Sequence, residues 1–419
     1  YTDSNNFKNQ SQSGKVRYEM QSRSEYTMKL LADQGILPNY AFPEEGITLS
    51  GSASIKTRST DAKKRYRWQK ISTSRPANPG LRELAPGNSF YIDGLKIPIT
   101  RIEVAAKGEP QLKLICDSCG TVSPVSQSYK KNEADCPVCQ AAGQAIRPII
   151  DVREVYGGGH FADLQLRDQE EERDIGELKV ETFINYHDAK LDGPMTHHAT
   201  WISESANAAF EFRMNANINF LVRGYKISDS FQYFKLCSSC LAIPYWLDKT
   251  GTGIFKPQGR FNRHSFKCEY YHSPNNPNCL NDQGYALGRN IQSDTIRFFA
   301  KDDSLLPSLQ ATLQLAMRVR LGGRPSHLGI LTSRLITAGG GAVWVATLYD
   351  DVPGGTGHLR SLMPSIADSF ETSIHGLTPI LDMFNKTRNY LLSCECVDGC
   401  YECLYTRSNQ YRQKNISKE

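Results

Sequence analysis

The 12 cysteines of the chain fall into three sets of four, and their spacing predicts metal sites. The first set pairs Cys116 with Cys119 and Cys136 with Cys139, and 16 residues separate the two CxxC pairs. Each pair lets two thiolates of one tight turn reach a single Zn²⁺, and the second pair completes a tetrahedron. Gly120 follows the first pair and suits the backbone of such a turn. The pattern predicts a zinc ribbon over residues 116–139.

The last set lies in the stretch CECVDGCYEC and places four thiols within ten residues: Cys394, Cys396, Cys400 and Cys403. Thiols this close together predict one shared metal ion. An iron–sulfur cluster also takes four cysteine ligands. Zinc is favoured here because clustered thiolates on short loops fit a closed structural zinc site and no redox partner motif accompanies them.

The middle set begins with a clear CxxC pair, Cys237 and Cys240, but its partners are ambiguous. Four side chains compete for the other two positions: His264, Cys268, His272 and Cys279. Three all-cysteine sites would require Cys268 with Cys279, whereas the short HxxxC spacing favours His264 with Cys268. We favour the HxxxC pair and keep Cys279 as the alternate for His264. In every case the site has four protein ligands and no open position, so up to three structural zinc ions are predicted.

Acidic side chains at predicted strand ends offer a different chemistry. Asp350 and Asp351 end an apolar run and precede a glycine-rich turn with His358, while Asp294 lies on an earlier predicted strand. Carboxylates that converge at strand ends can hold Mg²⁺ for phosphodiester cleavage. The alternative, which we favour, is turn formation and helix capping at a tight joint. No catalytic residue is therefore assigned.

A basic segment with interleaved aromatic residues predicts contact with nucleic acid. Between Ser50 and Arg75 the chain carries eight basic residues and one acid, with Tyr66 and Trp68 among them. Such a mixture can bind phosphates and stack on bases, although a solvated linker or strand edge has the same composition. The candidate nucleic-acid-binding residues are Lys63, Lys64, Arg65 and Arg67.

Elements around these residues predict a mixed α+β and α/β fold in three regions. Asp93-Gly94 between alternating apolar runs predicts a hairpin, and from Ile291 a strand, a helix capped by Ser304 and a second apolar strand follow. The regions are a polar extension and joining segment, 1–75; a β-rich domain with the inserted zinc ribbon, 76–225; and an α/β domain with zinc clusters at 237–279 and 394–403, residues 226–419.

Composition excludes several classes of protein. The chain has 419 residues, 39% of them hydrophobic and 22% charged, which is far from disordered, collagenous or coiled-coil compositions. Its net charge of +5 is weakly basic, short of a dedicated nucleic-acid binder. No apolar run spans a membrane and no secretory signal is visible, which predicts a cytoplasmic protein without a membrane partner. The polar start at Tyr1 suggests a fragment or processed product.

Several motifs resemble a known family. LYDDVPGGTGHL at 348–359, CECVDGCYECL at 394–404 and SNQ at 408–410 resemble the zinc-binding C-terminal region of MrfA-like superfamily 2 DNA helicases, also found in DrmB of the DISARM phage-defence system. LPNYAFPEEGITL at 37–49 and RELAPGNSFY at 82–91 are similar to joining segments of large defence helicases, including the Druantia type.

The resemblance implies a DNA-binding or accessory region of such a helicase, acting in antiphage defence or DNA repair. It implies that the last cysteine set binds metal, and it supports the HxxxC choice in the middle set. The motif GxxxxGK[ST] is absent from the chain, so ATP would act only through a motor upstream on a longer polypeptide or on a partner subunit. The alternatives are a Mg²⁺-dependent nuclease and a zinc-ribbon adaptor for protein interactions.

Overall fold

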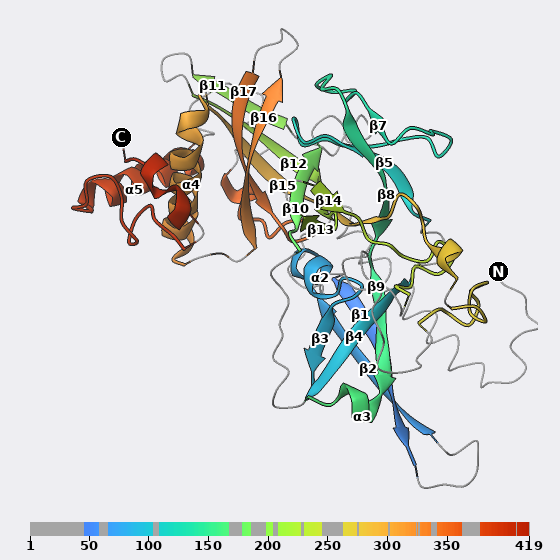
Figure 1. The fold of residues 1–419 in the computed structure, drawn as a ribbon. Helices are drawn as coiled ribbons and strands as arrows, with labels where there is room; N and C mark the ends of the chain where they lie inside the picture. Colours follow the sequence, from blue (N-terminus) through green and yellow to red (C-terminus); the bar gives the residue numbers. More distant parts are fainter. Residues whose placement is uncertain are drawn as a thin grey trace, which may run out of the picture. The chain divides into compact units, whose positions relative to one another are not determined.

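The computed structural model of the chain is drawn in Figure 1. It describes residues 46–57, 66–103, 109–166, 178–185, 198–203, 208–227, 230–244, 263–274, 276–300, 302–323, 325, 327–336, 342–362, 378–407 and 409–418. None of the helices in these ranges has both the length and the apolar content that crossing a membrane requires.

Contacts divide the chain into two compact units. Unit 1 comprises Tyr1–Glu44, Asp188–Asn217 and Ile291–Glu419, and unit 2 comprises Glu45–His187 and Ile218–Asn290. These cuts differ from the predicted boundaries at 75/76 and 225/226. The physical reason is the length of two strands, β12 (Ala208–Val222) and β15 (Ala286–Ala300), in each of which the chain passes from one unit to the other.

Unit 2 contains a five-stranded sheet in the order β2-β1-β9-β4-β3. Its strands are β1 (Ile47–Lys56), β2 (Tyr66–Arg75), β3 (Ser89–Ile92), β4 (Leu95–Glu103) and β9 (Glu154–His160), with helices α2 (Ala77–Glu83) and α3 (Phe161–Leu164) beside them. Side chains alternate along β1: Leu49 and Ala53 are fully buried, whereas Ser52 on the other face is hydrogen bonded to the Tyr156 hydroxyl at 2.7 Å. The sheet therefore has one apolar face and one polar face.

The predicted hairpin at Asp93-Gly94 is confirmed. β3 and β4 pair in antiparallel fashion, and Asp93 and Gly94 connect them with φ values of +49° and +72°. Two consecutive positive φ angles are the signature of a type I′ turn, which matches the right-handed twist of the flanking strands.

The rest of unit 2 carries the first two cysteine sets. Its elements are β5 (Gln111–Ile115), β6 (Val122–Pro124), β7 (Glu133–Ala134), β8 (Gln144–Asp151), β10 (Glu181–Asn185), the hairpin of β13 (Tyr225–Ile227) and β14 (Ser230–Gln232), and the turn η3 (Pro277–Cys279). β5 and β8 pair in antiparallel fashion, and the chain between them forms the predicted zinc ribbon.

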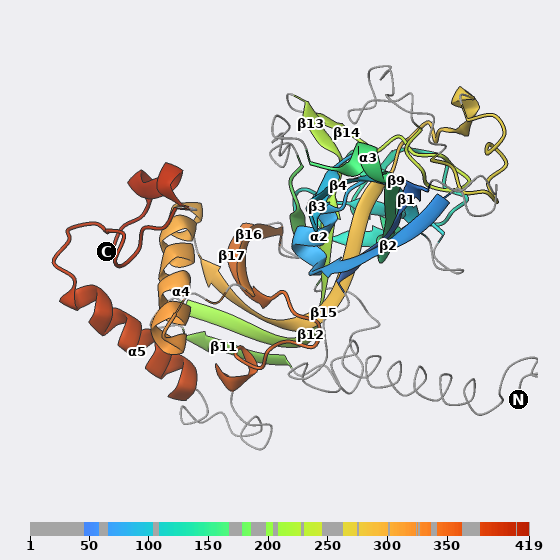
Figure 2. The same cartoon turned by 90° about the horizontal axis from the view of Figure 1, so that it is seen from below.

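Unit 1 is built on antiparallel strands with two helices. β11 (His198–Ser203) pairs with β12, and β17 (Ala342–Asp350) lies between β15 and β16 (Leu328–Ile336), antiparallel to both. α4 (Leu306–Leu321) packs on β16 and β17, and α5 (Thr378–Ser393) packs against α4 (Figure 2). The short turns η4 (Asp303–Leu305), η5 (Arg360–Leu362) and η8 (Gln410–Asn415) complete the unit.

Two sequence predictions for this unit are corrected. The region is α+β rather than α/β, because the unpredicted strand β16 follows α4 and returns the chain to pair with β17. The cap is also different: Asp302 accepts a hydrogen bond from the Ser304 amide in η4, and α4 begins at Leu306 with Pro307 in its first turn. Ser304 is thus capped by Asp302 and does not cap α4 itself.

Candidate metal centres

The twelve favoured ligands come together in three clusters. Within each cluster one donor atom per residue lies within 4.8 Å of the others: Cys116, Cys119, Cys136 and Cys139; Cys237, Cys240, His264 and Cys268; Cys394, Cys396, Cys400 and Cys403. All twelve cysteines of the chain are free thiols. A tetrahedral zinc site with Zn–S bonds of about 2.3 Å separates its sulfur atoms by about 3.8 Å. The donor sets and their spacing fit zinc, with no open position for substrate.

The zinc ribbon has this spacing across its two knuckles. The Sγ atoms of Cys116 and Cys139 lie 3.5 Å apart, and those of Cys119 and Cys136 lie 3.7 Å apart. Burial raises the pKa of the Cys119 thiol to about 11, although its hydrogen bonding with Thr121 acts in the opposite direction. Four buried thiols beside one another are costly without a shared cation, because their charged forms repel and their neutral forms lack strong acceptors.

The three CxxC turns of the first two clusters have the same backbone geometry. The amide of the residue four positions after the first cysteine donates to that cysteine's carbonyl, from Gly120 at 3.0 Å, Gln140 at 2.9 Å and Leu241 at 2.9 Å. These three residues also share a left-handed backbone, with φ of +70°, +59° and +53°. Glycine at the first turn is the only one of the three that the sequence indicates, since L side chains rarely adopt this conformation.

The middle cluster takes the HxxxC pair. His264 Nδ1 lies 3.4 Å from Cys240 Sγ and 3.5 Å from Cys268 Sγ, and Cys237 Sγ lies 3.7 Å from Cys268 Sγ. Cys279 is fully buried beside these groups but outside the four-donor set, and burial raises the pKa of its thiol. The structure therefore brings together the favoured ligands and leaves Cys279 as a neighbouring core thiol.

His272, the remaining candidate for the middle site, lies elsewhere. Its ring contacts the ring of Tyr271 edge to face at 5.2 Å, and it is not part of the donor cluster. His272 is therefore outside the donor set of the middle cluster.

The last cluster is the tightest of the three. Cys394 Sγ lies 3.5 Å from both Cys396 Sγ and Cys400 Sγ, and Cys403 Sγ lies 3.5 Å from Cys396 Sγ. Burial alone would raise the pKa of Cys400, but the amides of Glu402 and Cys403 lower it to about 7. A thiol with this pKa supplies a thiolate near neutral pH, the form that binds metal.

Residues distant in sequence hold the last cluster in place. Arg318 of α4 donates to the Cys403 carbonyl at 3.2 Å, and Lys418 Nζ donates to the carbonyls of Cys394 and Cys396, both at 2.7 Å. Burial lowers the pKa of Lys418, but the hydrogen bond and charge of Cys396 raise it overall. Nothing in the local spacing of the sequence indicates these contacts, because they depend on the packing of α4 and the C-terminal segment.

The acidic residues at the strand ends are already bound by protein groups. Asp350 is fully buried and accepts hydrogen bonds from the amides of Val352 at 3.1 Å and Thr356 at 2.6 Å. Asp294, only 1% exposed, forms a bidentate ion pair with Arg360. Among the described residues no group of metal donors includes either carboxylate. The arrangement anchors the glycine-rich turn, as the favoured alternative predicted, but residues 351–362, which follow Asp350, contain only the 3₁₀ turn η5, so the predicted helix capping is not observed there.

The other two residues of the predicted cluster, Asp351 and His358, both contact His327. His358 stacks on His327, with ring centroids 5.4 Å apart and planes inclined by 24°. Asp351 donates its backbone amide to the His327 carbonyl at 2.8 Å. The candidate Mg²⁺ cluster of the sequence analysis is therefore not assembled in the described part of unit 1.

Most of the predicted nucleic-acid-binding residues lie outside the described ranges. Lys63, Lys64 and Arg65 belong to the connection between β1 and β2, of which the structure describes only Thr57. Arg67 is exposed on β2, between Tyr66 at 42% and Trp68 at 57% exposure. Because β2 is an edge strand, these exposed aromatic side chains lie at one edge of the five-stranded sheet.

Comparison with known proteins assigns one part of the chain. Residues 309–404 match the family model of the MrfA Zn-binding domain. A solved structure, the DUF1998 helicase MrfA bound to DNA, aligns with 90% of this chain at 10% identity and a TM-score of 0.35. The chain spans 34% of the length of that helicase. No curated protein matches the chain. The cluster formed by Cys394, Cys396, Cys400 and Cys403 thus lies in a region, residues 309–404, that matches the MrfA Zn-binding domain.

Proposed function

We propose that the chain is a zinc-stabilised accessory region that works on DNA together with a superfamily 2 helicase motor. The observation that carries this proposal is the match of residues 309–404 to the MrfA Zn-binding domain, joined to the tetrahedral spacing of its four thiols. The motor, and with it ATP, would be supplied by a longer polypeptide or a partner subunit. Antiphage defence or DNA repair is the setting that the motif resemblance suggests.

The role of zinc in this proposal is to brace unit 1. Cys403 and Leu404 pack against Ala311 and Leu315 of α4, together with Ile416 of the C-terminal segment. A metal that fixes the four thiols therefore also fixes the contact between the end of α5, α4 and residues 410–418. A structural zinc contributes on the order of 10 kcal/mol at neutral pH, as much as the whole stability of an ordinary domain.

The part of the proposal that concerns DNA rests on the exposed end of β2. Tyr66 and Trp68 share one face of the strand and Arg67 stands on the other, since side chains alternate along a strand. Lys70 follows Trp68 on the same face and is also exposed. Aromatic rings stack on bases and neighbouring cations bind phosphates, which is the common arrangement for single strands.

Two measurements test the role of zinc and the affinity for DNA separately. Metal analysis of the purified chain is expected to find three zinc ions per chain, and one or two would mean that a cluster has been misassigned. A DNA titration at two salt concentrations is expected to give binding that falls steeply with added salt, because cations on the protein displace counterions from the phosphates. Binding absent at both concentrations would favour the protein-interaction adaptor instead.

Variants locate the DNA contact. Replacing Lys63, Lys64, Arg65 and Arg67 by Glu is expected to abolish binding, and Trp68→Ala is expected to weaken it about tenfold, because each stacked base contributes about 1–3 kcal/mol. Tyr129→Ala is the matched control, since Tyr129 is 38% exposed in the zinc ribbon, away from this strand. Retained binding in the fourfold Glu variant would contradict the assignment of this segment.

A further inference from the structure

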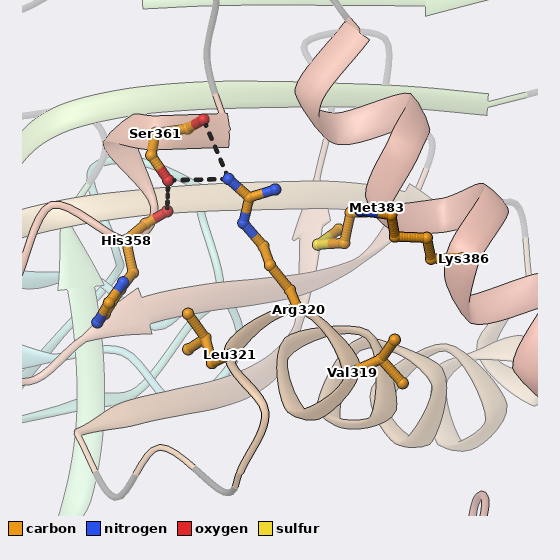
Figure 3. Close-up of a pocket in the computed structure, with 7 residues that line it drawn as sticks. All are labelled: Val319, Arg320, Leu321, His358, Ser361, Met383 and Lys386. Carbon is orange, nitrogen blue, oxygen red and sulfur yellow. Dashed lines mark hydrogen bonds between the residues drawn. The ribbon is translucent and has the colours of Figure 1, made fainter.

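A cavity of about 310 Å³ lies in unit 1 at the C-terminal turn of α4, beside η5 and α5 (Figure 3). Arg320 extends from α4 toward Ser361. Met383 and Lys386 line the cavity from α5, and His358 lines it from the turn before η5. Its volume is at the lower end of the range of about 300–1,000 Å³ that ligand pockets occupy. The cavity thus has room for a small ligand or for one group of a larger one.

The ionisable side chains that line this cavity are all basic. Arg320, Lys386 and His358 are basic, and no lining residue is acidic. Asp382 precedes Lys386 by one helical turn on α5, yet the two form no ion pair. Basic groups gathered in a hollow without a carboxylate create a positive potential that attracts an anion.

Arg320 is already held in position. Its Nη2 donates to the carbonyl of Ser361 at 3.4 Å and to its hydroxyl at 3.1 Å. The Ser361 hydroxyl in turn donates to the His358 carbonyl at 2.8 Å, so the turn and the guanidinium fix each other. Nε and Nη1 of Arg320 make no hydrogen bond within the described ranges. A planar guanidinium with two donors left over is suited to the bidentate binding of phosphate oxygens.

The ring of His358 is positioned too. It stacks on His327, which holds the imidazole plane at the border of the cavity, and its ring nitrogens make no hydrogen bond to the rest of the described chain. A neutral imidazole can donate a hydrogen bond from one ring nitrogen. The cavity therefore offers one fixed guanidinium, one long ammonium side chain and one imidazole donor.

We propose that this cavity binds a phosphate group, with Arg320 and Lys386 supplying the charge and His358 a hydrogen bond. The group belongs either to the backbone of a DNA strand or to free phosphate. The DNA-backbone source rests on the proposed function, whereas binding of phosphate itself does not.

The first experiment titrates the whole, zinc-loaded chain with inorganic phosphate by calorimetry, with chloride adjusted to keep the ionic strength constant. We expect saturable binding that Arg320→Gln and Lys386→Gln each weaken at least tenfold, since a hydrogen bond to a charged group contributes about 1.5–3 kcal/mol. Arg388→Gln is the control, because it removes the same charge from an exposed position of the same helix outside the cavity. Absence of saturable binding, or equal weakening by Arg388→Gln, would overturn the proposal.

Arg320→Gln removes the hydrogen bonds to Ser361 and could therefore disturb the turn at η5. Lys386→Gln tests the same site without that effect. Lys386 makes no hydrogen bond or ion pair among the described residues, so its replacement is expected to leave the thermal transition unchanged. A Lys386→Gln variant that folds normally and binds phosphate as tightly as the parent chain would also overturn the proposal.

The second experiment distinguishes the two sources of phosphate. If a DNA backbone occupies the cavity, inorganic phosphate competes with a short single-stranded oligonucleotide, and Lys386→Gln lowers the salt dependence of oligonucleotide binding by about one ion. If the oligonucleotide binds but phosphate does not compete, the ligand is a free phosphate and the proposed function is unaffected. If no oligonucleotide binds the parent chain, the proposed DNA function fails while the phosphate site stands on its own titration.

Discussion

Asp294 on β15 and Arg360 in η5 form a two-point ion pair, with Oδ2 3.1 Å from Nε and Oδ1 3.0 Å from Nη2. Asp294 is only 1% exposed, so its carboxylate has lost its hydration, and the ion pair with the Arg360 guanidinium is the main interaction that offsets that desolvation cost. Gly355 belongs to the same arrangement: with φ of +74°, it brings the turn so close that a Cβ would lie 3.1 Å from Asp294 Oδ2. The pair thus ties the turn after β17 to a neighbouring strand.

Removing the guanidinium of Arg360 should make the pH dependence of stability steeper. Burial raises the pKa of Asp294 despite Arg360, so its ionised form opposes folding and stability falls as pH rises through that raised pKa. Arg360→Gln leaves the buried carboxylate without its counter-charge, and we expect a loss of about 2 kcal/mol at pH 7 that shrinks toward pH 5 as the carboxyl is protonated. Urea unfolding at both pH values measures it. The double variant Asp294→Asn, Arg360→Gln should show no such pH dependence, and a loss equal at both pH values would contradict this account.

Asp350→Asn should destabilise the turn after β17, and we expect no loss of a catalytic activity. The side-chain amide would face the amide and hydroxyl of Thr356, which are both donors, so one buried hydrogen bond becomes a clash between donors. We expect a loss of about 1–3 kcal/mol in the free energy of unfolding. Incubation of the parent chain with DNA and Mg²⁺ provides the complementary measurement: cleavage that disappears in this variant while its fold persists would support the nuclease alternative.

The middle zinc site should distinguish His264 from Cys279. His264→Ala is expected to lower the zinc content from three ions to two, because it removes a donor 3.4 Å from Cys240. Cys279→Ser is expected to keep all three ions, with a modest loss of stability from placing a hydroxyl in a fully buried position. Metal analysis of the two variants side by side settles the ligand set, and the opposite pattern would identify Cys279 as the ligand.

Gln140→Gly should stabilise the zinc ribbon. Gln140 is exposed and adopts φ of +59°, a conformation that disfavours an L side chain by about 1–2 kcal/mol. Glycine relieves this strain but adds freedom to the unfolded chain, so the expected net gain is at most about 1 kcal/mol. Thermal unfolding of the zinc-loaded chain, parent and variant side by side, measures this gain. Lys130→Gly, at an exposed position of the same ribbon with negative φ, should be neutral or destabilising.

The sequence predicted the metal clusters better than the fold, and the reason lies in the range of the interactions. A CxxC turn places its two thiols by local geometry alone, so the pairs at Cys116 and Cys136 could be recognised from spacing. Spacing favoured His264 over Cys279 but did not decide between them, because the ligand set depends on how the loop that carries Cys268 packs against Cys237. The contacts of Arg318 and Lys418 with the last cluster depend on packing and left no pattern in the sequence.

β16 was missed for a tertiary reason. Its sequence, LGILTSRLI, has no regular alternation of apolar and polar residues, and it contains Gly329, a residue type that normally weakens a strand. In the structure it lies opposite Tyr349 on β17, where a Cβ would lie 2.3 Å from the tyrosine ring. The glycine leaves space for that ring, which can be recognised only once the pairing of the two strands is known. When β16 is left out, β15, α4 and β17 follow one another as strand, helix and strand, which is the order of an α/β unit.

The long strands β12 and β15 have a consequence for how this region can be handled. The segment that matches the family, residues 309–404, shares its hydrophobic core with Phe210 and Phe212 of β12 and with Ile296 and Phe298 of β15. Excised alone, it would leave the apolar sides of α4 and β17 uncovered, and such surfaces aggregate. The smallest piece that can be expressed, crystallised or grafted is therefore larger than the piece that sequence comparison recognises, and it must include strands from two earlier parts of the chain.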